Sequence, residues 1–191
     1  MTTVSGERIV LREKSITDAA RDFAWRADEE LAELDAAAPL RMAFPEYLMF
    51  YAEELDFPTP RRCRFAIDTL DGAHIGNCMY YDLNEVQGEC ELGIMVGDRD
   101  YWNKGYGTEA VNALLTHIFS TTRMRRVYLH TLDWNLRAQK AFEKSGFAPV
   151  GKLPRGGRTF VRMEITRDQW ESRKQTAQAR AETSARAEAR K

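Results

Sequence analysis

The segment 101–119 and the strand before it dominate the hydrophobic pattern of this chain. Residues 89–96 alternate apolar even-numbered positions with polar or small ones, which is typical of a strand with one buried face. After Gly105 and Gly107, apolar residues recur at the spacing of a helix that buries one side, namely Val111, Leu114, Leu115, Ile118 and Phe119. The predicted order is therefore a strand, a turn that contains two glycines, and a helix.

The same patterns predict the other elements. Strands are expected at 8–13, 64–68, from 75 onward, 127–132, 148–153 and 159–165, and the Asp71-Gly72 pair favours a hairpin between the second and third strands. Further helices are expected after the cap residues of 15–18, from Pro45, and from Asn135 to Gly146. In the first helix we expect an inner face made by Ala20, Phe23, Ala24 and Ala27.

Residues 171–191 differ from the rest of the chain. They contain no large apolar side chain, and they carry six basic residues against three acidic ones. A helix here would have nothing to bury and would be marginal. We therefore predict a domain at 1–170 and a charged tail at 171–191 that is a frayed helix or disordered. A helix that contacts RNA or another subunit is the alternative.

Composition narrows the class of protein. The chain has 191 residues, 43% of them hydrophobic, and a net charge of −1, so no general attraction to nucleic acid or membranes is expected. No apolar run approaches the roughly 18 residues that span a bilayer, and residues 1–7 lack the features of a signal peptide. Cys63, Cys78 and Cys90 show no CxxC spacing, which favours free thiols in a reducing cytoplasm and no metal site.

The turn at 101–108 is a candidate anion site. The first amides of a helix lack intrahelical partners and carry a partial positive charge. Gly105 and Gly107 let an anion approach the main chain, and Lys104 adds a charge. A tight turn before a core helix is the simpler alternative. The P-loop sequence is absent, and Ala110 stands where a dinucleotide-binding motif has its third glycine.

Two separated motifs resemble the GNAT superfamily of N-acetyltransferases. The first is Glu91-Leu92-Gly93-Ile94 followed by Tyr101-Trp102-Asn103-Lys104-Gly105-Tyr106-Gly107-Thr108-Glu109-Ala110, and the second runs from Asn135 to Phe147. The resemblance covers roughly residues 7–170. The tryptophan and the Thr-Glu-Ala sequence around the turn are similar to the branch that holds ribosomal-protein alanine and serine N-terminal acetyltransferases and spermidine acetyltransferases.

The resemblance implies an α/β (α+β) fold and a site for acetyl-CoA without a metal. We expect a mixed, mostly antiparallel sheet of about seven strands, with helices on both faces and a gap between the fourth and fifth strands. Main-chain groups of Ile94, Met95 and Val96 would bind the pantetheine arm. The pyrophosphate would be bound by the amides of the turn, namely Trp102, Asn103, Lys104, Gly105, Tyr106, Gly107 and Thr108. Asn135 would reach the pantetheine, and Lys140 or Arg137 an outer phosphate.

The implied chemistry is direct attack of a neutral amine on the thioester. Deprotonation at pH 7 costs about 1.1 kcal/mol for an α-amine and about 4.6 kcal/mol for a lysine-type amine. Glu91 is the first candidate base and His130 the second, although either could be an ordinary structural residue. Phe142 stands where many GNAT enzymes have a tyrosine that protonates the leaving thiolate, so Tyr80, Tyr81 or solvent would have to replace it.

The acceptor expected from the resemblance is a protein or peptide N-terminal α-amine. A polyamine or an amine-bearing drug is the alternative, and the acidic residues of 28–35 either attract such a cation or form a solvated helix face. A non-catalytic module that binds acyl-CoA or docks to a partner is another class of function, and a dinucleotide-binding oxidoreductase is a third. No membrane or nucleic-acid partner is expected, and a homodimer is left open.

Overall fold

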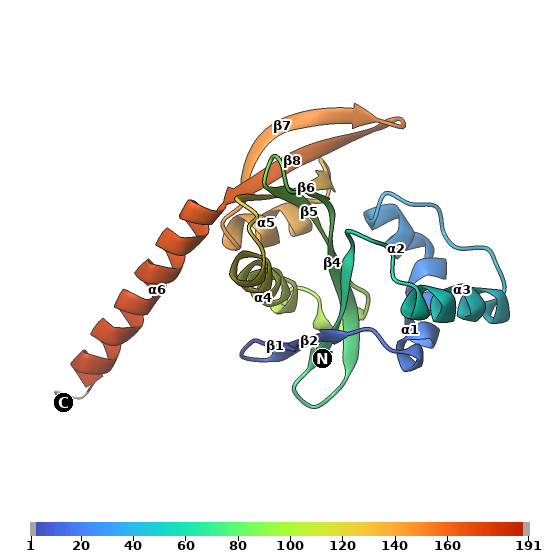
Figure 1. The fold of residues 1–191 in the computed structure, drawn as a ribbon, viewed down its shortest axis with the longest axis horizontal. Coiled ribbons are helices and arrows are strands. Elements are labelled where there is room, and N and C mark those ends of the chain that lie inside the picture. The colour runs from blue at the N-terminus through green and yellow to red at the C-terminus, as the bar shows by residue number, and fades with distance from the viewer. Residues whose placement is uncertain (1–2, 189–191) are drawn as a thin grey trace.

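A single sheet forms the centre of the computed structural model, which describes residues 3–188 (Figure 1). Its strands lie in the order β1-β2-β3-β4-β5-β6-β8-β7. In chain order they are β1 (Val4–Ser5), β2 (Ile9–Glu13), β3 (Cys63–Thr69), β4 (His74–Asn84), β5 (Glu89–Val96), β6 (Arg126–Leu132), β7 (Ala148–Arg155) and β8 (Arg158–Thr166). All neighbours in this described sheet are antiparallel except β5 and β6, which are parallel. The predicted mixed, mostly antiparallel sheet is confirmed, with the short β1 as an additional strand.

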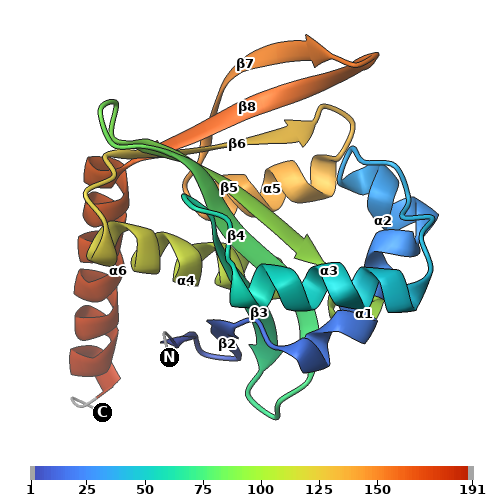
Figure 2. The ribbon, with the colours of Figure 1, turned by 45° about the vertical axis from the view of Figure 1, so that its right-hand side comes forward.

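Helices cover both faces of the sheet. They are α1 (Ala19–Ala27), α2 (Glu29–Leu34), α3 (Phe44–Asp56), α4 (Tyr106–Thr121), α5 (Leu136–Lys144) and α6 (Arg167–Glu188), with short 3-10 turns η1 (Ile16–Asp18) and η2 (Arg99–Tyr101). The first three lie on one side of the sheet, and α4 and α5 lie on the other (Figures 1 and 2). No helix among residues 3–188 is both long enough and apolar enough to cross a membrane.

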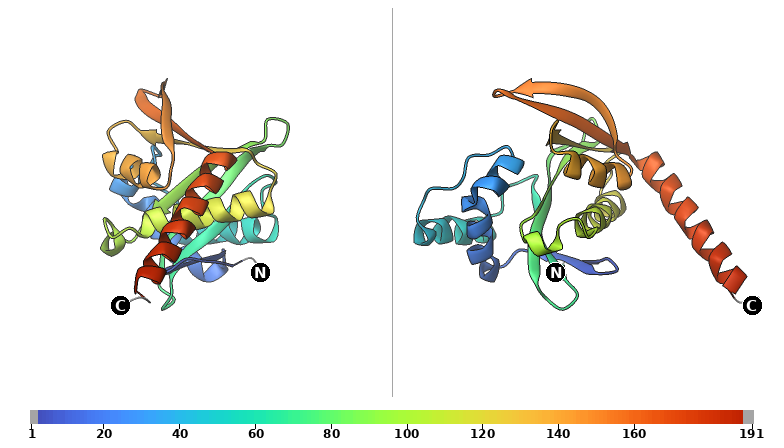
Figure 3. Two further views of the ribbon diagram at one scale, coloured as in Figure 1. Left: turned by 90° about the vertical axis from the view of Figure 1, so that its left-hand side faces the viewer. Right: turned by 180° about the vertical axis from the view of Figure 1, so that it is seen from behind.

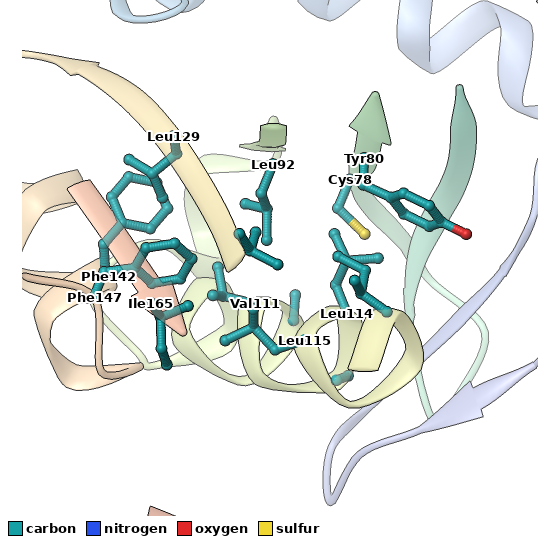
Figure 4. Close-up of a cluster of buried hydrophobic side chains, with 14 of the residues drawn as sticks. Cys78, Tyr80, Leu92, Val111, Leu114, Leu115, Leu129, Phe142, Phe147 and Ile165 are labelled. Atoms are coloured by element: carbon teal, nitrogen blue, oxygen red, sulfur yellow. The ribbon is translucent and has the colours of Figure 1, made fainter. Parts of the chain in front are cut away.

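The main core lies between α4 and the sheet. Val111, Leu114, Leu115 and Ile118 of α4 are 0–1% exposed, which confirms the predicted inner face of this helix. Figure 4 shows Val111, Leu114 and Leu115 on the side of α4 that faces residues of β4, β5, β6 and α5. Burying each Leu or Ile contributes about 1.5–3 kcal/mol. This packing fixes the position of α4 against β5.

A fork in the sheet separates β5 from β6. The two strands pair at Glu89–Arg126, Cys90–Val127 and Glu91–Tyr128, and no further pair follows. Residues 92–96 remain paired with β4 on their other side. The gap predicted between the fourth and fifth strands is therefore present. These two predicted strands are β5 and β6 in the structure, because the short β1 was not among the predicted strands.

The predicted inner face of α1 is wrong. Asp22 and Trp25 are buried, whereas Ala24 is exposed and Phe23 packs against α3, with its ring 5.3 Å from that of Phe44. The reason is that the buried face of α1 contains a charged residue. A search for apolar residues at helical spacing cannot find such a face.

Asp22 is the centre of a buried polar network. Its carboxylate accepts hydrogen bonds from the Tyr51 hydroxyl at 3.0 Å and the Asn77 amide at 2.8 Å, and it pairs with Lys14 Nζ at 2.8 Å and His74 Nε2 at 3.2 Å. Burial would raise the pKa of Asp22, but the bond from His74 and the charge of Lys14 outweigh it and lower the pKa. The network ties α1 and α3 to β4 and to Lys14, the residue that follows β2.

Helix α6 begins on the domain and then leaves it. The Arg167 guanidinium donates to the carbonyls of Thr122 at 2.9 Å and Met124 at 2.8 Å, and the Trp170 ring lies 5.3 Å from Phe119. One turn later, Arg173 donates to the Lys144 carbonyl at 2.7 Å, and the rest of the helix projects away from the domain (Figures 1 and 3). The division of the chain into a domain at 1–170 and a marginal tail at 171–191 stays a prediction. Residues 189–191 of that tail lie outside the described residues.

Candidate active site

A cavity of about 460 Å³ lies where β5 and β6 diverge. We call it the fork cavity. Its wall is made by β5, the 101–108 turn, α4, α5 and α2, and it includes Ile94, Val96, Trp102, Gly105, Gly107, Thr108, Asn135, Lys140 and Phe142. The two motifs found in the sequence therefore come together around one cavity.

The edge of β5 that faces the fork offers main-chain groups to a ligand. The amide of Gly97 donates to the Ile75 carbonyl, and this bond fixes the alternation of the β4–β5 ladder. Ile94 and Val96 consequently direct their amides and carbonyls away from β4, whereas those of Met95 point toward β4. The Val96 carbonyl already accepts a hydrogen bond from Trp102 Nε1 at 2.6 Å. The amide and the carbonyl of Ile94 and the amide of Val96 are therefore available to bind a ligand.

The turn before α4 presents its amides to the cavity. Asn103 and Gly105 adopt left-handed backbone conformations, with φ of 58° and 87°, and Gly105 is the N-cap of α4. Within residues 3–188, the amides of 103–108 make no short, well-aligned hydrogen bond to the protein. Free amides at the positive end of a 16-residue helix form a site suited to phosphate.

Arg8 fixes this turn from behind, and sequence reasoning missed it. Its Nη1 donates to the Lys104 carbonyl at 2.9 Å, and its Nε pairs with Glu109 at 2.8 Å. The positive φ of Gly105 favours glycine there, and a Cβ at this position would also lie 3.1 Å from Arg8 Nη2, which is a tight contact. Arg8 and Glu109 are 101 positions apart, and no local pattern in the sequence could have joined them.

Trp102 lies between two arginines at the cavity wall. The Arg137 guanidinium stacks 3.5 Å from the centre of the indole, and that of Arg99 lies at 5.4 Å. Burial lowers the pKa of Arg137. Arg99 also binds Asp28 at 2.8 Å and Glu30 at 2.7 Å. Part of the acidic run of 28–35 is therefore neutralised by ion pairs and is not an open acidic rim.

The remaining predicted cofactor residues differ in how they reach the cavity. Asn135 is 8% exposed, and its Oδ1 caps α5 by accepting from the Ala138 amide at 3.2 Å. Its Nδ2 has no partner in the described chain and is left for a ligand. Lys140 also contributes to the wall. Lys104 and Tyr106 do not, and the Tyr106 ring packs against Tyr101 at 5.0 Å, so their predicted role is restricted to the main chain.

The two candidate bases lie together at the base of the fork. Glu91 Oε1 is 2.9 Å from His130 Nδ1, and the two side chains are 14% and 11% exposed. Glu91 also lies opposite Tyr81 on β4 and Tyr128 on β6, on the same face of the sheet. Burial and the neighbouring Glu91 raise the pKa of Tyr81. The structure thus joins side chains that the sequence presented as separate alternatives.

Other candidates are excluded by their place in the fold. Tyr80 is 4% exposed in the α4 core, where its ring lies 5.9 Å from that of His117, so it cannot serve as the acid that was considered. His117 and His74 are both buried. Phe142 lines the cavity with a ring that cannot donate a proton. In residues 3–188, no group of three His, Cys, Asp or Glu side chains is arranged to hold a metal.

Sequence comparisons agree with this arrangement. Residues 8–148 match the model of the acetyltransferase (GNAT) domain. The spermine/spermidine N(1)-acetyltransferase of Bacillus subtilis (strain 168) is 27% identical over 100 residues, which are 50% of this chain and 66% of that protein. The match thus spans just under two thirds of the relative. An uncharacterized N-acetyltransferase, p20 of Bacillus licheniformis, is 24% identical over 155 residues, which are 80% of this chain and 86% of that protein.

Solved structures share the fold. A spermidine N-acetyltransferase from Vibrio cholerae, in complex with CoA and spermine, superposes with a TM-score of 0.75 at 19% identity and covers 85% of this chain and 97% of that one. The aminoglycoside acetyltransferase AAC(6')-Ib in complex with coenzyme A gives a TM-score of 0.71 at 21% identity, with 86% of this chain and 98% of that one covered.

Proposed function

We propose that this chain, which belongs to the GNAT acetyltransferase family, transfers an acetyl group from acetyl-CoA to a primary amine, and that the amine is a polyamine. The observation that carries the proposal is the fork in the sheet. Main-chain groups of β5 and the N-terminus of α4 line the fork cavity, and the Glu91–His130 pair, which is not part of the cavity wall, lies where β5 and β6 separate. The reaction requires a site that binds an extended thioester cofactor and a basic group near the thioester.

The cavity suits the parts of acetyl-CoA in order. The amides of 103–108 would hold the pyrophosphate, where each charge-assisted bond contributes about 1.5–3 kcal/mol. Ile94 and Val96 would bind the amides of the pantetheine arm as a neighbouring strand does, and Asn135 Nδ2 would add a donor. Lys140 would pair with an outer phosphate. The acetyl group would then lie in the fork, close to where β5 and β6 begin to separate.

The acceptor side supports a cationic amine. Glu89 and Glu164 are neutralised by Arg126, which lies 2.9 Å and 3.3 Å from them, whereas Glu91 has His130 as its one basic partner among residues 3–188. Glu91 lies between two tyrosines, and a carboxylate beside aromatic rings is a favourable environment for an ammonium group. Relatives that are named for spermine and spermidine point the same way. We therefore favour a polyamine over the peptide N-terminus that the sequence resemblance placed first.

The reaction would proceed by direct attack of the neutral amine on the thioester carbon. For an amine with a pKa near 10.4, deprotonation at pH 7 costs about 4.6 kcal/mol, so a base in the site is useful. Holding both reactants in the fork would supply much of the acceleration.

The test is the release of free CoA thiol from acetyl-CoA with a panel of acceptors. The panel holds spermidine, spermine, N-terminal alanine and serine peptides, an aminoglycoside and free amino acids. We expect kcat/KM to be highest for a polyamine. A higher value for a peptide would return the acceptor to the N-terminal class. Binding of acetyl-CoA without thiol release from any acceptor would identify a non-catalytic module.

A further inference from the structure

We propose that His130 carries out both proton transfers of the reaction and that Glu91 is the residue that positions it. The inference rests on the proposed acetyl transfer and adds the identity of the acid and the base. The sequence analysis took Glu91 as the first candidate base and His130 as the second, and this inference reverses that order. It also explains how the reaction proceeds although Phe142 replaces the expected tyrosine.

Glu91 is poorly placed to act as the base itself. It belongs to the last pair of the β5–β6 ladder, where the two strands are still joined. Its Oε1 is engaged by His130 at 2.9 Å, and the hydroxyl of Tyr81 lies beside the same carboxylate.

His130, unlike Glu91, lies beyond the part of β6 that is paired with β5. It lies two residues beyond Tyr128, the last β6 residue that pairs with β5, so it belongs to the separated part of the fork. A carboxylate only accepts hydrogen bonds, so the Nδ1 that faces Glu91 carries the hydrogen and Nε2 is the basic nitrogen of the neutral ring. Nε2 has no protein partner among residues 3–188. The ring is held further by Tyr128, whose ring lies 5.7 Å away in an edge contact.

No other side chain in the described site can replace this nitrogen. Phe142 has no proton to give, and Tyr80 is buried in the α4 core. Tyr81 lies next to Glu91, but burial and that carboxylate raise its pKa, so it resists giving up its proton. Arg162, which pairs with His130 across β6 and β8, stacks over Tyr128 and binds Glu164 at 2.7 Å.

The steps balance with one histidine. The reacting species is the neutral amine, because the substrate ammonium has already lost one proton to solvent. The amine forms a C–N bond to the thioester carbon, and its nitrogen becomes positive. His130 Nε2 takes one proton from this nitrogen, and Glu91 stabilises the resulting imidazolium. The C–S bond then breaks, and its electron pair leaves on sulfur as the thiolate. The imidazolium returns the proton to that sulfur, which gives the acetylated amine, free CoA thiol and a neutral His130.

The experiment compares His130→Ala with Glu91→Gln and Glu91→Ala, after turnover of spermidine by the unaltered protein has tested the proposed function on its own. General acid–base catalysis contributes roughly 10²–10⁴-fold. We expect His130→Ala to lower kcat by about that factor. Glu91→Gln keeps an oxygen that can accept from Nδ1 and should lower kcat by roughly tenfold. The loss of kcat in Glu91→Ala should lie between the losses in Glu91→Gln and His130→Ala. Acetyl-CoA affinity and Tm should change little in all three.

Rescue by added imidazole separates a proton carrier from a structural side chain. Imidazole should restore turnover to His130→Ala, with a rate that follows the basicity of substituted imidazoles, and it should not restore Glu91→Ala. The exposed Glu53→Gln is the control for loss of a carboxylate and should behave as the unaltered protein. The inference is overturned if Glu91→Gln loses more kcat than His130→Ala, or if His130→Ala binds acetyl-CoA normally and imidazole does not restore it.

Discussion

Removing Arg8 should weaken cofactor binding without changing the chemistry. Arg8 lies behind the 102–108 turn, where it binds the Lys104 carbonyl and Glu109 and lies 4.7 Å from the centre of the Tyr106 ring. Without these contacts, the turn would have to be ordered by the cofactor itself, and part of the binding free energy would be used for that ordering. Arg8→Ala therefore tests whether the anion site is preformed.

The magnitude follows from the contacts. A charge-assisted hydrogen bond contributes about 1.5–3 kcal/mol when buried and an exposed ion pair about 0.2–1 kcal/mol. Because the Arg8 side chain is 47% exposed, the first value must be reduced, and a total of about 1–2 kcal/mol is reasonable. Since 1.4 kcal/mol is a factor of ten, Kd for CoA should rise about 5- to 30-fold.

The assay is calorimetric titration with CoA, together with KM and kcat for acetyl-CoA. The Kd of Arg8→Lys should lie between those of the unaltered protein and Arg8→Ala, because lysine keeps the charge but lacks the forked guanidinium. Arg62→Ala is the matched control, since it removes an ion pair with Glu54 on the other side of the sheet. An unchanged Kd for Arg8→Ala, or a fall in kcat at saturating acetyl-CoA, would refute the idea of a braced turn.

Three further predictions concern the site and its supports. Asn135→Asp keeps the cap of α5 but loses the Nδ2 donor, so KM for acetyl-CoA should rise while Tm stays the same; Asn135→Ala should also lose about 1 kcal/mol of stability in urea unfolding. Asp22→Asn should destabilise the fold by about 3–5 kcal/mol at pH 7, because it removes the negative partner of a buried lysine. The pKa of Asp22 is lowered on folding, so its contribution is fully present above the ordinary carboxyl pKa and is lost only as the pH falls below it toward the lowered pKa of the folded state. The difference between the two proteins should therefore stay nearly constant from pH 7 to about 5 and shrink below about pH 4, and a difference that began to shrink near neutral pH would contradict this account. Gly97→Ala should cost about 1–3 kcal/mol, since its Cβ would lie 2.1 Å from the Trp25 ring, whereas Gly151→Ala, with nothing within 4 Å, should leave Tm unchanged.

The predictable part of the fold is the part with a regular hydrophobic period. The α4 face, the alternation in β5 and the glycine turn between them were visible because each is local in sequence. The predicted strands agree with the observed ones within a few residues, and the fork followed from the motifs that resemble the GNAT family. Asn135 as the N-cap of α5 was likewise a local signal, and its side chain makes that bond.

The missed part is made of long-range polar contacts. Arg8 and Glu109 meet across 101 positions, and Asp22 meets His74 across 52. Charged residues at these positions look like surface residues in a sequence, because their burial depends on partners that only the fold supplies. For the same reason, Glu91 and His130 were each plausible as separate bases, and their pairing across the fork was not predictable.

One feature of the topology accounts for most of the site. Within the described sheet, β5 and β6 are the only parallel neighbours, and α4 is the crossover that joins them. A crossover helix starts beside the end of the strand that it follows, so the N-terminus of α4 lies at the end of β5; α5 follows β6 in the same way. Both helices therefore direct their positive ends toward the gap between the two strands, which suits an anionic cofactor. The strands themselves remain joined only as far as Glu91 and Tyr128, so the Glu91–His130 pair lies at the closed end of that gap. A change that extended the β5–β6 ladder by one pair would therefore close the reaction site while leaving the phosphate site intact.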